Sequence, residues 1–92
     1  AQYGAVVFLQ TTGNVLDRRA EIALQRYIEA GGGFVGIHAA ADAEYDNRWY
    51  GRLVGAYFAS HPAIQEARLV VEDTKHPSTQ PLASLPNGEW RR

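Results

Sequence analysis

The chain lacks cysteine and methionine and carries almost no net charge. Because there is no cysteine, disulfides, thiolate nucleophiles and thiolate zinc sites are excluded. The 9 basic and 10 acidic side chains are scattered along the 92 residues, so the basic stripe that nucleic-acid binders carry is missing. No apolar run approaches the roughly 20 residues that a membrane helix needs. We therefore expect neither a nucleic-acid partner nor a membrane partner.

The composition is that of an ordinary globular protein. Hydrophobic residues make up 46% of the chain and charged residues 21%, which is typical of a folded domain. A chain of this length buries roughly 60–65% of the surface that it exposes when unfolded. We expect one small domain with a modest core and no large internal cavity.

Residues 5–38 predict a βαβ unit of parallel strands. Residues 5–9 and 34–38 are continuous apolar runs, which is typical of strands covered on both faces. Between them, Asp17 suits the N-cap of a helix that runs to Ala30. The apolar face of that helix is predicted to hold Ala20, Ala23, Leu24, Tyr27 and Ile28.

The rest of the chain gives weaker patterns. After His38, acidic and polar residues without an apolar period indicate a loop. Apolar residues at helical spacing follow, although Gly51 and Gly55 weaken this helix. Prolines accumulate after Asp73, which is typical of an irregular segment. The predicted segments are a polar loop over 39–48, a short helix over 49–58, a strand over 67–72 and an irregular tail over 73–92.

The glycines of residues 31–36 match the pattern G-x-G-x-x-G in letters only. A dinucleotide-binding fingerprint needs these glycines after a strand and at the start of a helix. Here they follow a helix and open a strand. A helix cap and a tight turn account for them.

His38 stands at the end of the second strand with small residues on both sides, Gly36 and Ala40. This arrangement is similar to a nucleophile elbow, in which crowding forbids larger neighbours, although the elbow position holds histidine instead of serine or cysteine. The carboxyl ends of parallel strands are also where open α/β sheets bind ligands. A functional role and a structural hydrogen-bonding role both remain open for His38.

Three carboxylates follow in the polar loop: Asp42, Glu44 and Asp46. They supply acid–base groups or oxygen ligands at short spacing, and a solvated loop is the simpler interpretation. The neighbouring rings of Tyr45 and Trp49 suit stacking on a sugar, whereas Tyr50, Tyr57 and Phe58 suit the core.

Imidazole and carboxylate groups also suit zinc or iron. His38, His61 and a carboxylate would therefore form an alternative divalent-metal set, which their spacing does not define. No cofactor is expected from the sequence.

Several stretches combine into a specific string: 5–9 with 11–13, 27–28, 31–42, 44–46, 49–58, 60–62, and 71–73 with 76–79. Together they resemble the ThuA-like (trehalose-utilisation) domain family over essentially the whole chain. The resemblance implies an α/β fold with a flavodoxin-like, doubly wound, mainly parallel sheet, related to class I glutamine amidotransferases. It places His38 where those enzymes have their cysteine. It also implies a connection to sugar metabolism, mostly in bacteria and often beside sugar oxidoreductase or carbohydrate-binding domains.

Members of that family begin with a further strand and helix before the equivalent of Tyr3 and continue past the equivalent of Arg92. We therefore expect this chain to be the central part of the domain. An incomplete sheet exposes apolar edges and faces, which favours self-association or packing against a neighbouring domain.

The leading hypothesis is a domain that binds or processes a carbohydrate or a modified sugar, for example an oxidised one. The expected catalytic groups are His38, Asp42 and Glu44, and the expected substrate-binding residues are Tyr45, Asp46, Trp49 and His61. The alternative is a non-catalytic binding or scaffold module beside a carbohydrate-active enzyme domain. Whether the domain is an enzyme stays open at this point.

Overall fold

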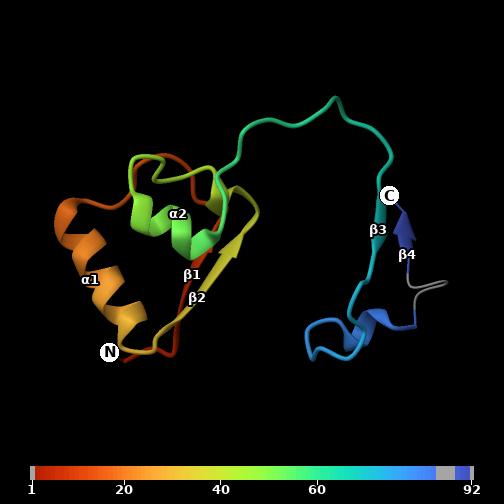
Figure 1. Ribbon diagram of the computed structural model, residues 1–92, viewed down its shortest axis with the longest axis horizontal. Helices are drawn as coiled ribbons and strands as arrows, with labels where there is room; N and C mark the ends of the chain where they lie inside the picture. Colours follow the sequence, from red (N-terminus) through yellow and green to blue (C-terminus); the bar gives the residue numbers. More distant parts are fainter. Residues whose placement is uncertain (1, 85–88, 92) are drawn as a thin grey trace. The chain divides into compact units, whose positions relative to one another are not determined.

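Two separate two-stranded sheets organise the chain, of which the computed structural model describes residues 2–84 and 89–91. One sheet belongs to the unit Ala1–Ser60 and the other to the unit His61–Arg92 (Figure 1). In chain order the elements are β1 Ala5–Leu9, α1 Arg18–Glu29, β2 Gly33–Ile37, the 3-10 turn η1 His38–Ala41, α2 Arg48–Val54, β3 Arg68–Val70, the 3-10 turn η2 Gln80–Leu82 and β4 Glu89–Arg91.

The predicted parallel pairing of β1 and β2 is confirmed. The strands are in register from Ala5 opposite Gly33 to Leu9 opposite Ile37, so their carboxyl ends lie side by side. Helix α1 connects them, as expected for a crossover between parallel strands. The first unit is therefore α/β, with a small parallel sheet.

Helix α1 begins at its predicted cap. The Asp17 Oδ1 atom accepts a hydrogen bond of 2.7 Å from the backbone N–H of Ala20, which satisfies one of the free amides of the first turn. The helix ends before Gly31, whose φ of 98° is costly for residues with a side chain. Leu24 is buried as expected, but Ala23 is exposed, so the apolar face is narrower than its spacing predicted.

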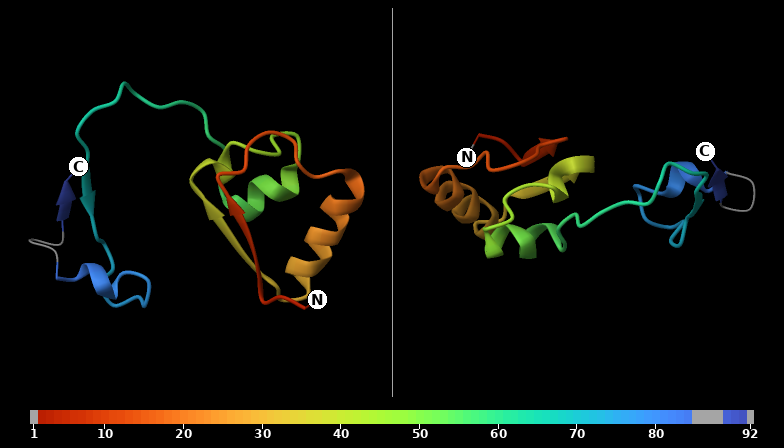
Figure 2. Two further views of the ribbon diagram at one scale, coloured as in Figure 1. Left: turned by 180° about the vertical axis from the view of Figure 1, so that it is seen from behind. Right: turned by 90° about the horizontal axis from the view of Figure 1, so that it is seen from above.

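Three aromatic rings form the core between the sheet and α2. Phe8 on β1 and Phe34 on β2 have ring centroids 5.3 Å apart, and the Tyr50 ring lies 5.8 and 6.1 Å from them. Tyr50 has no exposed surface, and its hydroxyl donates a 2.6 Å hydrogen bond to the Ala40 carbonyl. Burial raises the pKa of Tyr50. Seen from above in Figure 2, α2 lies on one side of β1 and β2.

The opposite face of this sheet is apolar and open. Its side chains are exposed over 42–64% of their surface, and they are Val7, Leu9, Val35 and Ile37. Helices normally cover both faces of a parallel sheet. The four side chains on this face are instead about half exposed.

The structure corrects several of the predicted boundaries, among them the second strand, which spans Gly33–Ile37 instead of 34–38. The loop begins with the helical turn η1, and α2 ends at Val54 instead of 58 because Gly55 takes a left-handed φ of 95°. The strand predicted over 67–72 is limited to β3. The tail is not wholly irregular, because it contains η2 and β4, and β4 pairs antiparallel with β3. Residues 85–88 and 92 of that tail lie outside the described residues.

None of the helices in residues 2–84 and 89–91 combines the length and the apolar character that crossing a bilayer requires.

Replacement of Tyr50 by phenylalanine tests the core. Tyr50→Phe keeps the ring but leaves the buried Ala40 carbonyl without its donor, so we expect the free energy of unfolding to fall by about 1–3 kcal/mol. Urea denaturation of the full-length protein measures the change. The control is Tyr27→Phe, which removes an exposed hydrogen bond to the Tyr3 carbonyl and should cost less than about 1 kcal/mol. Equal losses in the two variants would contradict this description of the core.

Candidate functional site

The candidate site lies at the carboxyl ends of β1 and β2, where two polar residues follow the strands directly. Gln10 follows β1 and His38 follows β2, and the Gln10 backbone N–H donates to the Ile37 carbonyl at 3.1 Å. Both residues have a left-handed backbone, with φ of 52° and 55°, which is uncommon outside glycine. Both are exposed. The strand ends therefore present a glutamine and a histidine next to each other.

Small residues are closely packed around the turn at His38. A Cβ placed on Gly36 would lie 3.1 Å from the Ala40 Cβ and 3.4 Å from the Phe34 ring, so a larger residue at Gly36 would force its neighbours apart. Ala40 itself is buried. Among the described residues the His38 imidazole makes no hydrogen bond or ion pair. Its side chain is consequently available to a ligand.

Glu44 is buried and holds the backbone of the first loop. Its side chain is 3% exposed, and its Oε1 atom accepts hydrogen bonds from the backbone N–H groups of Val15 at 2.6 Å and Leu16 at 2.9 Å. A carboxylate that accepts two amides is a strong, charge-assisted acceptor. Glu44 also has a positive φ of 51°. These contacts give Glu44 a structural task beside the strand ends.

Backbone hydrogen bonds reinforce that contact. Gly13 and Ala43 form a parallel bridge, in which the Gly13 N–H donates to the Asp42 carbonyl at 3.1 Å and the Glu44 N–H donates to the Gly13 carbonyl at 3.0 Å. The loop after β1 and the loop after η1 are thereby joined. A joined pair of loops holds the residues at the strand ends in one geometry.

Asp42 and Tyr45 form a polar pair in the second loop. The Tyr45 hydroxyl lies 2.5 Å from Asp42 Oδ1 and 2.9 Å from the Phe58 carbonyl, and its one proton can be donated to only one of them at a time. The hydrogen bond to Asp42, together with desolvation and the charge of Asp42, raises the pKa of Tyr45 to about 12. Asp42 is half-buried and Tyr45 is exposed over 44% of its surface.

One face of the Tyr45 ring is already occupied. The Tyr57 ring stacks on it with centroids 5.0 Å apart, and the Tyr57 hydroxyl donates to the carbonyls of Asn47 or Glu44. Gly51 on α2 makes room for Tyr57, because a Cβ there would lie 2.7 Å from the Tyr57 ring. A sugar could therefore stack on Tyr45 from one side only.

The remaining expected site residues are Asp46, Trp49 and His61. Asp46 is exposed and Trp49 is half-buried at the start of α2. His61 belongs to the second unit, where its Nδ1 atom lies 2.8 Å from the Pro62 carbonyl oxygen. The expected residues of the elbow and the polar loop all belong to the first unit.

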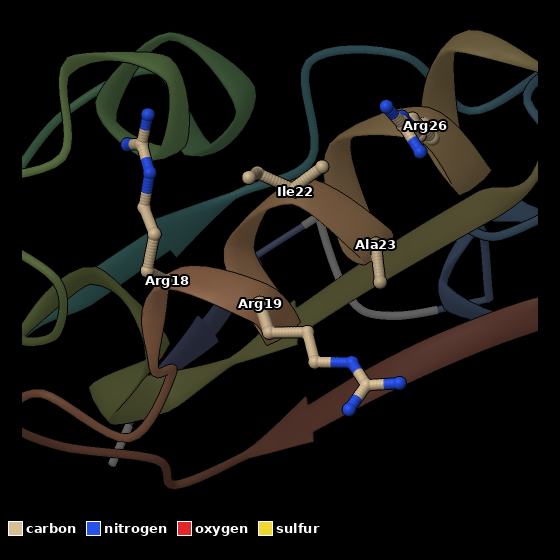
Figure 3. Close-up of a pocket in the computed structure, with 5 residues that line it drawn as sticks. All are labelled: Arg18, Arg19, Ile22, Ala23 and Arg26. Carbon is tan, nitrogen blue, oxygen red and sulfur yellow. The ribbon is translucent and has the colours of Figure 1, made fainter.

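A surface hollow of about 460 Å³ lies elsewhere, on α1. Figure 3 shows its five lining residues, with the three guanidinium groups spread in different directions. The lining residues are Arg18, Arg19, Ile22, Ala23 and Arg26. All come from one helix, and none is an acid–base group at the strand ends. A second hollow of about 470 Å³ in the other unit is lined by residues 69–73 with His76, Thr79 and Leu82. Neither hollow contains a residue of the elbow.

Residues 2–84 and 89–91 contain no group of three or more histidine, aspartate and glutamate side chains that could hold a metal ion. The alternative set of His38, His61 and a carboxylate draws on both units and stays a prediction of the sequence.

Gln10 is the residue of this site that the sequence interpretation did not select. It lay in the polar loop after the first strand. The argument that selected His38, a polar residue directly after a parallel strand, applies equally to Gln10.

The contact between Asp42 and Tyr45 should be visible in a tyrosine titration. Because the folded pKa of Tyr45 lies above its ordinary value of 10.0, the contact stabilises the fold fully below pH 10 and loses its effect as the pH rises through about 12. Asp42→Asn removes the charge, so the pKa of Tyr45 should fall towards 10.0. The ultraviolet absorbance of tyrosinate measures this, with Asp46→Asn as the control that leaves the tyrosine titration curve unchanged. An unchanged titration curve in Asp42→Asn would contradict the contact.

Replacement of Glu44 by glutamine tests the connection between the loops. Glu44→Gln keeps the size of the side chain but removes the charge from a buried acceptor of two amides, so we expect a loss of about 1.5–3 kcal/mol in the free energy of unfolding. Urea denaturation measures it. Glu66→Gln, at an exposed glutamate, should change stability by less than about 0.5 kcal/mol. A loss no larger than that of the control would show that the carboxylate does not hold the loops.

Comparison with known proteins agrees with the resemblance seen in the sequence. A family model described as ThuA, trehalose utilisation, matches residues 1–91. No curated protein matches the chain, and no solved structure does. Because the family match covers essentially the whole chain, the resemblance is confirmed: the chain belongs to the ThuA family, whose description indicates a general role in the utilisation of trehalose or other sugars.

Proposed function

We propose that this domain binds and processes a carbohydrate, or a modified sugar such as an oxidised one, at the carboxyl ends of β1 and β2. The observation that carries the proposal is the position of His38. Its imidazole is exposed, follows a parallel strand directly and stands on a left-handed backbone between crowded small residues. Residues held in such sparsely populated conformations cluster at functional sites.

In this proposal His38 is the general acid or base, or a ligand-binding group. An imidazole can give a proton to a sugar oxygen or accept one from a hydroxyl near neutral pH, and it needs no partner within the protein to do so. Supporting this role, nothing in the described part of the chain occupies the imidazole. The reaction class is proton transfer at a hydroxyl or carbonyl group of the sugar.

The loop after η1 supplies the other proposed groups. Asp42 is the polar partner that faces the Tyr45 hydroxyl, and Asp46 is exposed beside it. The free face of Tyr45, with Trp49, forms the proposed stacking wall. Glu44 was expected as a catalytic group, and its buried amide contacts support a proposed role in positioning the loops instead. His61, which belongs to the second unit, stays a substrate-binding prediction of the sequence.

We also propose a flavodoxin-like, doubly wound sheet for the complete domain, related to that of the class I glutamine amidotransferases. The open face of the β1–β2 sheet supports this architecture, because a parallel sheet needs helices on both of its faces. On this fold, His38 occupies the elbow at which those related enzymes carry a thiol.

A second candidate function is a non-catalytic binding or scaffold module packed beside a carbohydrate-active enzyme domain. The exposed valine, leucine and isoleucine side chains of the open sheet face favour it, because such a face suits an interface with another domain or a second copy. The two functions differ in turnover: the module binds a sugar without converting it.

Replacement of His38 by asparagine tests the leading function. Asparagine tolerates a left-handed backbone, so His38→Asn should fold while losing the imidazole. With the full-length protein and a panel of trehalose, glucose and gluconolactone, we expect turnover to fall by about 10²-fold or more, which is the usual contribution of a general acid or base. Product analysis gives turnover and calorimetry gives affinity.

The matched control is His76→Asn, at a histidine outside the proposed site, and it should leave both quantities unchanged. If the wild-type protein binds a sugar of the panel without converting it, and His38→Asn weakens that binding, the result would favour the non-catalytic module. Unchanged binding and turnover in a folded His38→Asn variant would refute the role of His38, and absence of binding by the wild-type protein to the whole panel would refute the sugar site.

A further inference from the structure

We infer that Gln10 is the second ligand-contacting residue of the His38 site, and that its side-chain amide binds a sugar hydroxyl beside the imidazole. The inference rests on the proposed function, because it names a further residue of the same site. It is carried by the backbone of Gln10, by the register of the strands and by the absence of any other use for the amide in the described residues.

Gln10 and His38 share a backbone conformation that is uncommon for residues other than glycine. Within residues 2–84 and 89–91, three residues other than glycine have a positive φ: Gln10, His38 and Glu44. Such a conformation is unfavourable for a residue that carries a Cβ. A fold retains that cost only where its surroundings impose the conformation.

Glu44 provides an internal comparison. Its positive φ accompanies a buried carboxylate that accepts two backbone amides, so its conformation has a structural explanation. The positive φ of Gln10 and His38 has no such explanation, because both side chains are exposed and neither makes a hydrogen bond among the described residues. Their conformation instead presents two polar side chains to solvent at one edge.

The register makes the two residues neighbours. Leu9 lies opposite Ile37, so the next residues along the parallel strands are Gln10 and His38. The Gln10 N–H donates to the Ile37 carbonyl, which extends the pairing by one bond beyond the strand ends. Neighbouring strands lie about 4.8 Å apart, so one small ligand can reach both side chains.

The chemistry of the pair suits a polyhydroxylated ligand. A glutamine amide offers two N–H donors and a carbonyl acceptor, while a neutral imidazole offers one donor and one acceptor. A sugar hydroxyl donates one hydrogen bond and accepts others, so adjacent hydroxyls match an amide and an imidazole side by side. Gln10 would orient the sugar for His38, and it would act as a positioning and specificity residue.

The first experiment tests the juxtaposition without any sugar. Gln10→His places a second imidazole beside His38, and two adjacent imidazoles bind Ni²⁺ more tightly than one. Calorimetry with Ni²⁺ on the full-length protein should show a gain of about tenfold or more in affinity over wild type. The gain should vanish in the double variant Gln10→His with His38→Asn. Equal Ni²⁺ affinity in Gln10→His and in the double variant would overturn the inference.

The second experiment tests the contact with the ligand. Gln10→Ala keeps the Cβ and hence the backbone preference of the position, but removes the amide. We expect affinity for trehalose to fall about 3–10-fold, as loss of one hydrogen bond predicts, with the urea midpoint unchanged. Thr12→Ala, at an exposed position in the same loop, should leave affinity unchanged. Gln10→Asn, which retains the amide on a shorter arm, should recover part of the loss.

The outcomes separate this inference from the function on which it rests. If His38→Asn abolishes binding or turnover while Gln10→Ala binds the sugar as the wild type does, Gln10 is not a contact and only this inference fails. If neither variant changes binding or turnover, the proposed site and the inference fail together. Loss of affinity in both variants, with no loss in Thr12→Ala, supports the pair.

Discussion

The parallel pairing of β1 with β2 is the constraint on which the described site depends. It places Gln10 and His38 next to each other, because residues that follow paired parallel strands emerge at the same edge. The pairing in turn depends on apolar side chains, since Phe8 and Phe34 pack on the buried Tyr50. The Tyr50 hydroxyl also donates to the carbonyl of Ala40, which lies two residues after His38 in η1. The geometry at the strand ends therefore depends on the packing of the core.

Glu44 extends that constraint to the loops. Its carboxylate and the Gly13–Ala43 bridge join the segment after β1 to the segment after η1, so neither can move without breaking several hydrogen bonds. A site assembled on a joined pair of loops is held in place before a ligand arrives, which lowers the ordering cost of binding. In the proposed site, Glu44 positions the loops and does not contact the ligand.

Much of the first unit could be predicted from the sequence because its determinants are local. The continuous apolar runs of the two strands and the cap at Asp17 act over a few residues. The contacts that escaped prediction are long-range. The amides that Glu44 binds lie 28 and 29 residues away in the chain, and β4 owes its existence to pairing with β3. The early end of α2 depends on the left-handed conformation of Gly55, which a helical spacing of apolar residues does not reveal.

The central claim is that a sugar binds at the adjacent ends of β1 and β2. The most direct test is a crystal structure of the full-length protein with trehalose bound. The account predicts that sugar oxygens lie within hydrogen-bonding distance, about 2.7–3.2 Å, of both the His38 imidazole and the Gln10 amide. Trehalose bound at another surface, with both side chains facing only water, would contradict it.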